Sequence, residues 1–261
     1  MRGHWAVVVA TAAARRTLSD RAGLAVGTLF YLLVTGVIST VWRTAAGESD
    51  TGLVAGYSAA ALGWYLAASE VTAVAINPRL IEAIGEDIAG GAVESEMLRP
   101  APVVGVRLAA ALGTALPRIA CCAVGGSALA LATAGSPPDA AGLALAAPAL
   151  VLGVACNLAT QHAAAAAAFW LRDAKSAWFL YQKFVFMLGG LLLPIEVLPG
   201  WLERVATLLP FAAMAYVPGR LASGHVEPGL LLVQVGWLAV MTALAALAFA
   251  RGERRLQAVG A

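Results

Sequence analysis

Three side chains able to carry charge lie inside long apolar stretches of the sequence, where a charge is costly. They are Glu70, Arg118 and His162. If each stretch is a helix, Glu70 and Arg118 lie roughly 9 and 15 Å from the same membrane surface, which is close enough for two long side chains to meet. We therefore predict a structural ion pair between Glu70 and Arg118, with a proton or substrate relay as the alternative. His162 is expected to be a hydrogen-bonded core residue.

The sequence lacks the residue patterns of the common catalytic sites. A P-loop needs a glycine-rich turn before Lys and Ser or Thr, and neither Lys175 nor Lys183 follows one. No HExxH motif occurs, and the three histidines and three cysteines have no metal-ligand spacing. Ser58 is expected near the outer end and His162 deeper toward the cytoplasm, which argues against a Ser/His pair. We expect a chain that is no enzyme by itself and holds no metal or cofactor.

The composition indicates a membrane protein. Of 261 residues, 61% are hydrophobic and 12% charged, whereas a soluble domain carries about 25% charged residues. No basic cluster interleaved with aromatics indicates nucleic-acid binding. A membrane span needs roughly 20 apolar residues. We predict an all-α integral membrane protein, one domain over residues 1–261, with six transmembrane helices at about 22–42, 53–76, 108–134, 140–171, 177–195 and 229–250.

The distribution of Lys and Arg predicts the orientation in the membrane. Of the 17 basic residues, 13 fall on the side of both termini. The opposite side holds only Arg43, Arg204 and Arg220. The positive-inside rule therefore places both termini in the cytoplasm. The excess of Arg over Lys and the abundance of Ala are typical of a GC-rich bacterial genome, so we expect a bacterial inner membrane.

The first 21 residues are expected to form an interfacial helix on the cytoplasmic leaflet. As a helix they have a polar face and an apolar face, formed respectively by His4, Thr11, Arg15 and Ser19 and by Trp5, Val8, Val9 and Ala12. A cleaved secretory signal is the alternative. The basic residues that follow at once, and the full span after them, favour the interfacial helix.

The longest cytoplasmic segment, residues 77–107, contains a short amphipathic helix. Its apolar face consists of Ile81, Ile84 and Ile88, at positions i, i+3 and i+7. Glu82 and Glu86 lie elsewhere on the helix, and Gly90-Gly91 ends it. The helix is either a solvated link between two spans or a docking helix for a soluble partner.

A second irregular segment, residues 193–228, lies on the outer side. It is too apolar for a free loop and too rich in proline for a span. Non-helical backbone at membrane depth must be buried in protein or line a cavity. We predict short re-entrant helices in the outer leaflet, with Glu196, Glu203 and Arg204 at the interface; a loop packed on the external surface is the alternative.

These features resemble the permease subunits of ABC-2 type exporters. Residues 84–100 are similar to the cytoplasmic family motif through Ile84, Ile88, Gly91, Leu98, Arg99 and Pro100. The region from Gly189-Gly190 to Gly224 is similar to a second motif through Pro194, Pro199, Trp201, Leu202, Pro210, Phe211, Tyr216 and Pro218. The topological resemblance extends over essentially the whole chain.

The resemblance implies half of an ATP-driven exporter. Two permeases, identical or related, would combine with two copies of a separate ATPase that binds ATP and magnesium. Residues 81–91 would be the coupling helix contacting this ATPase, with Ile81, Ile84, Glu86, Asp87, Ile88 and Gly91 as its main residues. A lipophilic or amphipathic small molecule is the expected substrate, in contact with membrane lipid.

Two other functions stay open. An ion-coupled secondary transporter would use Glu70, Arg118 or His162 as titrating groups within the membrane. A membrane assembly subunit would need no transport path.

Overall fold

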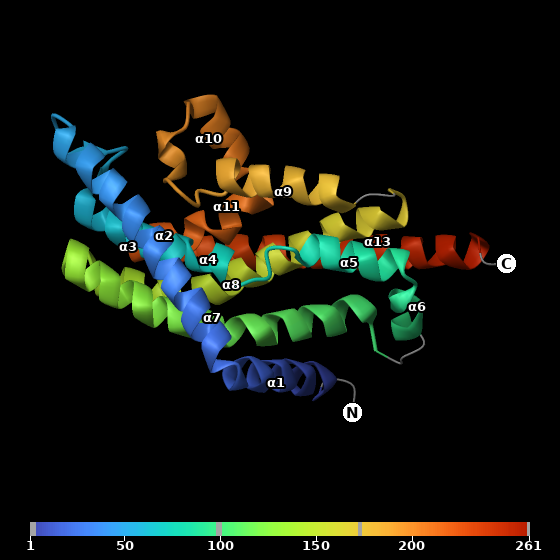
Figure 1. Cartoon of the computed structure of the whole chain (residues 1–261). Coiled ribbons are helices and arrows are strands. Elements are labelled where there is room, and N and C mark those ends of the chain that lie inside the picture. Colours follow the sequence, from blue (N-terminus) through green and yellow to red (C-terminus); the bar gives the residue numbers. More distant parts are fainter. Residues whose placement is uncertain (1–3, 98–100, 172–173, 260–261) are drawn as a thin grey trace.

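The computed structural model describes residues 4–97, 101–171 and 174–259, which form long helices running side by side and several short ones (Figure 1). In chain order the elements are α1 His4–Ser19, α2 Arg21–Glu48, β1 Leu53–Val54, β2 Tyr57–Ser58, α3 Ala59–Ser69, α4 Val71–Val74, α5 Leu80–Ala89, α6 Ala92–Met97, α7 Val103–Ala134, α8 Ala140–Ala165, η1 Ala166–Phe169, α9 Ala174–Leu188, η2 Ile195–Val197, α10 Gly200–Thr207, α11 Pro210–Met214, α12 Tyr216–Ala222 and α13 Gly229–Val259. The predicted all-α class is confirmed.

Among the described residues, four helices are long and apolar enough to cross a membrane: α2, α7, α8 with η1, and α13. The other two predicted spans are shorter. The apolar stretch formed by α3 and α4 covers Ala59–Val74, and α9 has 15 residues. Because a complete crossing needs roughly 20 residues, the multi-pass architecture is confirmed and the count of six spans stays a prediction.

The second predicted span begins later than expected. Its first residues form a small antiparallel hairpin in which Val54 pairs with Tyr57. Ala55 and Gly56 form the two-residue turn with φ values of +50° and +86°, as hairpin turns of the primed types require. Ser58 then caps α3, because its hydroxyl accepts a hydrogen bond from the Ala61 amide at 3.2 Å. Apolar composition alone did not distinguish this hairpin from the helix that follows.

The N-terminal helix packs lengthwise against the first half of α7. A Cβ atom added to Gly113 would lie 2.2 Å from the Ala10 carbonyl oxygen, and one on Gly105 would meet the Trp5 ring at 2.8 Å. Asp20 separates α1 from α2 and caps α2 by accepting a hydrogen bond from the Gly23 amide at 2.9 Å. The predicted helix is therefore present, and its location at the membrane interface stays a prediction.

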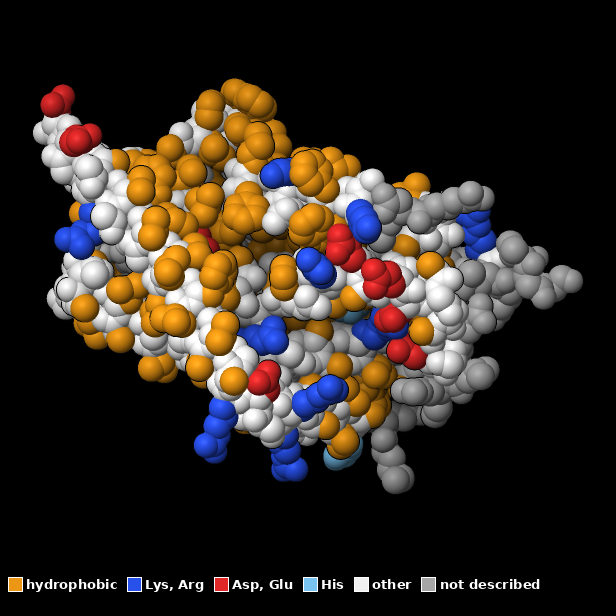
Figure 2. Space-filling model, in the orientation of Figure 1, with side chains coloured by type: hydrophobic (Ala, Val, Ile, Leu, Met, Phe, Trp, Pro, Cys, Tyr) orange, Lys and Arg blue, Asp and Glu red, His pale blue; other side chains and the backbone are white. Residues whose placement is uncertain are grey.

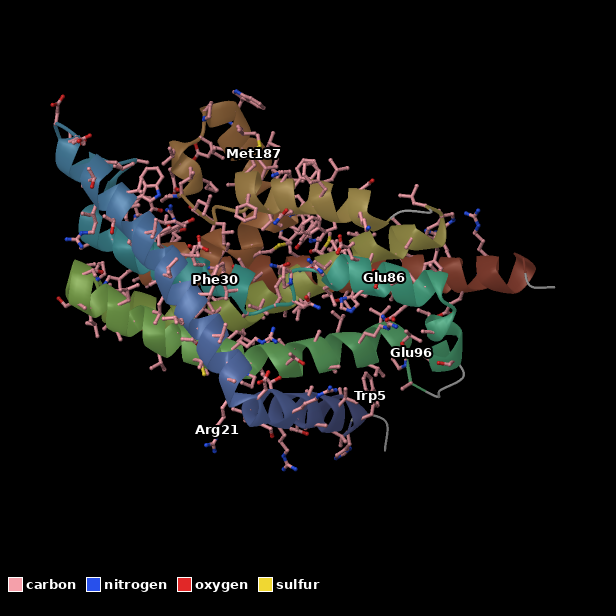
Figure 3. The ribbon with its side chains drawn as sticks, viewed as in Figure 1. Trp5, Arg21, Phe30, Glu86, Glu96 and Met187 are labelled. Carbon is pink, nitrogen blue, oxygen red and sulfur yellow. The ribbon has the colours of Figure 1, made fainter. Side chains whose placement is uncertain are left out.

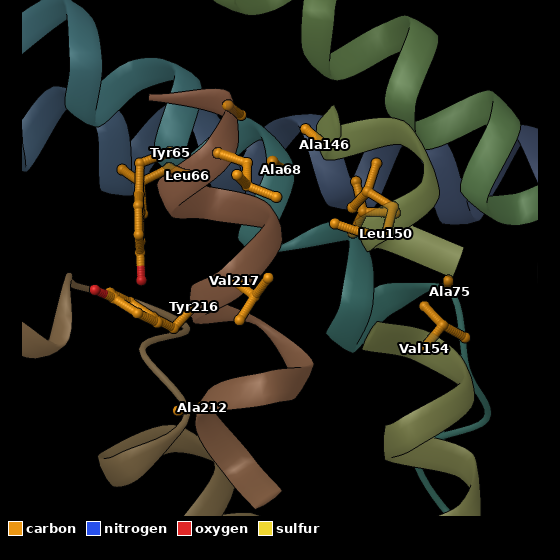
Figure 4. Packing of buried hydrophobic residues seen from close by; sticks show 14 of the residues in the cluster. Tyr65, Leu66, Ala68, Ala75, Ala146, Leu150, Val154, Ala212, Tyr216 and Val217 are labelled. Atoms are coloured by element: carbon orange, nitrogen blue, oxygen red, sulfur yellow. The ribbon is translucent and has the colours of Figure 1, made fainter. Parts of the chain in front are cut away.

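The largest core lies where α12 packs between α3 and α8 (Figure 4). Tyr65 and Leu66 of α3 meet Tyr216 and Val217 of α12 there (Figure 4). Small residues allow this close approach. A Cβ atom on Gly219 would lie 2.8 Å from the Tyr65 ring. The short helices near the end of the chain are thus part of the central packing.

Between α9 and η2 the backbone is not helical. Side chains from α2 and α3 donate hydrogen bonds to its carbonyl groups. The Trp42 indole donates to the Leu192 carbonyl at 2.9 Å, and the Ser69 hydroxyl donates to the Leu191 carbonyl at 3.0 Å. The Tyr65 hydroxyl donates to the Gly190 carbonyl. These bonds supply the partners that non-helical backbone needs inside a membrane protein.

The segment that follows, predicted as re-entrant, is a series of short helices. Pro194 and Pro199 immediately precede η2 and α10, and Pro210 is the first residue of α11. Proline is well tolerated at a helix start, because its missing amide donor has no partner there. The segment is therefore neither a span nor a free loop, and its insertion into the outer leaflet stays a prediction.

Candidate functional site

The amphipathic helix α5 packs its apolar face against the chain itself. Ile81, Ile84 and Ile88 are at most 5% exposed. They belong to a cluster that includes Phe169 and, from α13, Phe249. Gly91, with φ +75°, follows the end of the helix, as predicted. The isoleucines that mark the expected coupling helix therefore hold it to the bundle and do not form a surface for a partner.

An arginine of α7 holds α5 and α6 together. Arg107 forms ion pairs with Asp87 of α5 at 2.8 Å and with Glu96 of α6 at 2.7 Å. Glu86 is exposed on α5, at the same end of the molecule as Glu96 (Figure 3). The sequence hypothesis treated Asp87 and Glu86 alike, but their surroundings differ. Asp87 forms an ion pair within the chain, whereas Glu86 faces outward. Leu98, Arg99 and Pro100 of the motif lie outside the described residues.

The outward side of α5 borders a groove of about 660 Å³. Glu82, Gly85, Glu86 and Ala89 form one wall, and the groove is further lined by Ala168, Phe169, Trp170, Leu171, Lys175 and Arg255. Trp170 is 45% exposed. Acidic, basic and aromatic side chains thus meet in one concave surface, as in a polar interface with an aromatic anchor. Figure 2 shows charged side chains of both signs over the part of the molecule that contains α5.

The predicted ion pair between Glu70 and Arg118 is wrong, because no ion pair joins these two residues in the described part of the chain. Arg118 lines a cavity of about 300 Å³ together with Arg107 and His162. Glu70 lines a different cavity, of about 510 Å³. The residue spacing gives the depth of each side chain along its helix but not the direction in which it points. Two side chains at similar depth therefore need not face each other.

His162 is a buried residue whose Nδ1 lies 2.7 Å from the Leu158 carbonyl oxygen. Its predicted role as a hydrogen-bonded core residue is confirmed. Asn157 was not singled out from the sequence, although two amides one helical turn apart in an apolar stretch, Asn157 and Gln161, were a usable signal. It joins three elements, because its amide group bonds Thr72, Gln161 and Tyr181.

A second charge cluster lies at the end of the molecule that the sequence predicts to be the outer one, which we call the outer end. The Glu196 carboxylate accepts hydrogen bonds from the Tyr57 hydroxyl at 3.0 Å and the Tyr216 hydroxyl at 2.7 Å. Arg220 forms an ion pair with the same carboxylate and another, at 2.7 Å, with Glu227. Sequence reasoning placed Glu196 and Arg220 on the same side but did not pair them, because 24 residues separate them and α12 brings them together.

The remaining residues of the predicted outer segment have separate roles. Phe211 stacks on Phe184 of α9, with ring centroids 5.7 Å apart. Pro218 is buried within α12. Trp201 is 68% exposed on α10. The segment therefore packs inward through Phe211 and Pro218 and presents Trp201 outward.

These features define a multi-pass α-helical membrane protein with a short amphipathic helix, α5, and a short-helix segment before α13. A family model described as "ABC-2 family transporter protein" matches residues 31–260. The chain therefore belongs to the ABC-2 transporter family and is a transport permease of that type. Permeases of this family are generally non-catalytic and work with an ABC ATPase. No curated protein matches the chain.

Proposed function

We propose that the chain is the permease subunit of an ATP-driven exporter and forms half of its translocation path. A separate ATPase, present in two copies and binding ATP and magnesium, would supply the energy. A second permease, identical or related, would complete the path. Both termini would lie in the cytoplasm of a bacterial cell, and the exported molecule would be lipophilic or amphipathic.

The observation that carries this proposal is the groove beside α5. The helix is fixed from behind by its buried isoleucines and by the ion pair between Asp87 and Arg107. Its outward side, with Glu82 and Glu86, lines the groove. A partner seated there would push on a helix firmly packed against α8 and α9. A force applied by nucleotide-driven closure of the ATPase would therefore reach the membrane helices.

The need for a second permease is supported by the exposed apolar faces of α2 and α9. Phe30 and Leu33 of α2 and Phe179 and Met187 of α9 are all more than half exposed. Such faces require either lipid or another protein. A translocation path formed between two copies would cover these faces with protein.

The proposal is tested by purifying the tagged chain from its native membrane in mild detergent and identifying its partners by mass spectrometry. A stoichiometric subunit with a P-loop is the expected result. The double variant Glu82→Lys and Glu86→Lys should retain about one tenth of that subunit or less, because two charges in the interface change sign. Glu48→Lys, on the exposed outer end of α2, is the matched control.

Other results would contradict the proposal in distinct ways. Recovery of the chain alone, under conditions that preserve other complexes, would favour ion-coupled transport. An intact complex that exports nothing when supplied with ATP would favour an assembly role. Unchanged ATPase binding in the double variant would show that the partner docks elsewhere.

A further inference from the structure

A buried carboxylate without a partner lies in the cavity bounded by α2, α4, α8 and α9, which we call the Glu70 cavity. Its volume is about 510 Å³, within the range of small-molecule pockets. Most of its lining is apolar, with contributions from Phe30, Val34, Val74, Val185 and Phe186. Glu70 itself is 3% exposed, and its Oε1 atom has no hydrogen-bond partner among the described residues.

No basic side chain of the described residues neutralises Glu70. Its lining neighbours include no Lys, Arg or His. The ammonium group of Lys183, on α9, lies 5.0 Å from the centre of the Phe179 ring, and Arg118 lines the other cavity. An unpaired carboxylate in apolar surroundings is costly, so it either takes up a proton or requires a cation from outside the chain.

Three other polar side chains of the cavity, Asn157, Gln161 and Tyr181, already bind one another. The Gln161 amide donates to Asn157 Oδ1 at 2.8 Å, and the Tyr181 hydroxyl donates to the same oxygen. The Asn157 amide donates to the Thr72 carbonyl at 3.3 Å. Glu70 is therefore the charged group of the lining that a ligand can reach, with the partly buried Gln182 amide as a further polar neighbour. The surrounding apolar surface suits the body of an amphipathic molecule.

We infer that the Glu70 cavity binds a lipophilic monocation, such as a bulky organic ammonium or phosphonium ion, with its charge against the Glu70 carboxylate. The inference names a substrate class and so rests on the proposed function. Two of the bounding helices, α2 and α9, carry exposed apolar side chains such as Phe30 and Met187 (Figure 3). A lipophilic cation dissolved in the membrane would meet these faces first.

The test uses two probes of nearly the same shape and opposite charge. Binding of tetraphenylphosphonium and tetraphenylborate is measured by equilibrium dialysis on the purified permease–ATPase complex in detergent. We expect the cation to bind at least about tenfold more tightly than the anion, because one unit charge faces it in a low-dielectric site. Glu70→Gln should abolish this preference, and Glu70→Asp should keep most of it.

Matched controls separate the charge from the fold. Glu48→Gln makes the same change at an exposed position at the end of α2, outside the cavity lining, and should leave cation binding unchanged. ATP hydrolysis by the complex and its elution volume check that the Glu70 variants are folded. Equal binding of both probes by the natural chain would overturn the assignment, and it is also the result that a protonated Glu70 would give. A cation preference that survives Glu70→Gln would overturn it as well.

The same preparation distinguishes failure of this inference from failure of the proposed function. ATP-driven export of some other molecule, without binding of tetraphenylphosphonium, would refute the ligand class and leave the exporter in place. Glu70-dependent binding of the cation in a preparation that ATP does not drive would support the site and contradict the exporter.

Discussion

The two ends of the molecule are built around the same charge motif but differ in what surrounds it. At each end one arginine bridges two carboxylates from different elements: Arg107 binds Asp87 and Glu96, and Arg220 binds Glu196 and Glu227. At the outer end two tyrosine hydroxyls also bind Glu196. The other end instead places α5 on an apolar cluster and leaves two of its acids, Glu82 and Glu86, beside an open groove.

This difference indicates that the outer end depends on polar bonds and the α5 end on apolar packing. The outer segment is short helices joined by irregular backbone, so its many polar groups need internal partners. The α5 helix satisfies its own backbone and needs only an apolar surface to rest on. At the outer end the chain itself supplies the charged and hydroxyl partners of Glu196 through its Oε1 atom, whereas α5 is fixed from one side only.

The largest effect is expected from Arg220→Met. The variant leaves the half-buried Glu196 carboxylate without a counter-charge, which should lower the free energy of unfolding by about 3 kcal/mol. Unfolding of the purified protein by a denaturing detergent measures the change. Arg204→Met, an exposed arginine on the neighbouring α10, should change it by less than about 0.5 kcal/mol. Equal effects of the two variants would mean that the outer network contributes no stability.

A smaller loss is expected at the other end from Ile84→Ala. The side chain is 2% exposed, and its truncation leaves a cavity under α5. The cost should be about 2 kcal/mol, near the lower end for such changes, because a helix of 10 residues at the edge of the bundle can shift to fill the space. The same unfolding measurement applies. Ile84→Val, which keeps most of the volume, should cost about 1 kcal/mol or less.

A further test of the outer end is Tyr65→Phe, which removes one hydroxyl and keeps the ring. The Gly190 carbonyl then loses its donor in a buried position, at a cost of about 1 to 2 kcal/mol. Thermal unfolding of the detergent-purified variant provides the measurement. If stability is unchanged, the irregular backbone after α9 does not depend on side chains from α3, and the contrast between the two ends fails.

The smallest effect is a pH dependence at the outer end. Burial, and then the charge of Arg220, hold the pKa of His225 below its usual value of 6.5. The unfolded chain therefore binds a proton more readily than the folded one, and stability falls as the pH drops from 6.5 through the lower folded pKa. Apparent unfolding temperatures at pH 7.5 and 5.5 should show a drop that is smaller in His225→Gln. An identical drop in the variant would exclude His225 as its source.

The sequence predicted the helical class, the existence of α5 and its end at Gly90-Gly91, because these depend on composition, periodicity and glycine chemistry within short windows. It also identified the proline-rich outer segment as irregular, since proline limits helices locally. It assigned the hairpin at residues 53–58 to a span, because its apolar residues have the same composition as the helix that follows. The α5 isoleucines were correctly placed on one face.

Pairings between distant residues were beyond reach, because residue spacing fixes depth along a helix but not the direction a side chain takes around the bundle. Glu70 and Arg118 were paired by depth and lie in separate cavities. Glu196 and Arg220 were not paired, although they share an ion pair. The difference between Glu86 and Asp87 was hidden for the same reason. The sequence did not show that Arg107 binds Asp87 and leaves Glu86 exposed.

The hydrogen bonds that Trp42, Tyr65 and Ser69 make to the backbone after α9 also have a mechanical consequence. They join α2 and α3 to the backbone just after α9, so in the proposed mechanism these three helices would pivot together when the ATPase pushes on α5. An exit that opens by prying them apart would break three bonds at once, whereas a seam between two chains opens without breaking any. We therefore expect distances between spin labels on α2 and α9 of one chain to stay constant through the ATP cycle, while distances between chains change.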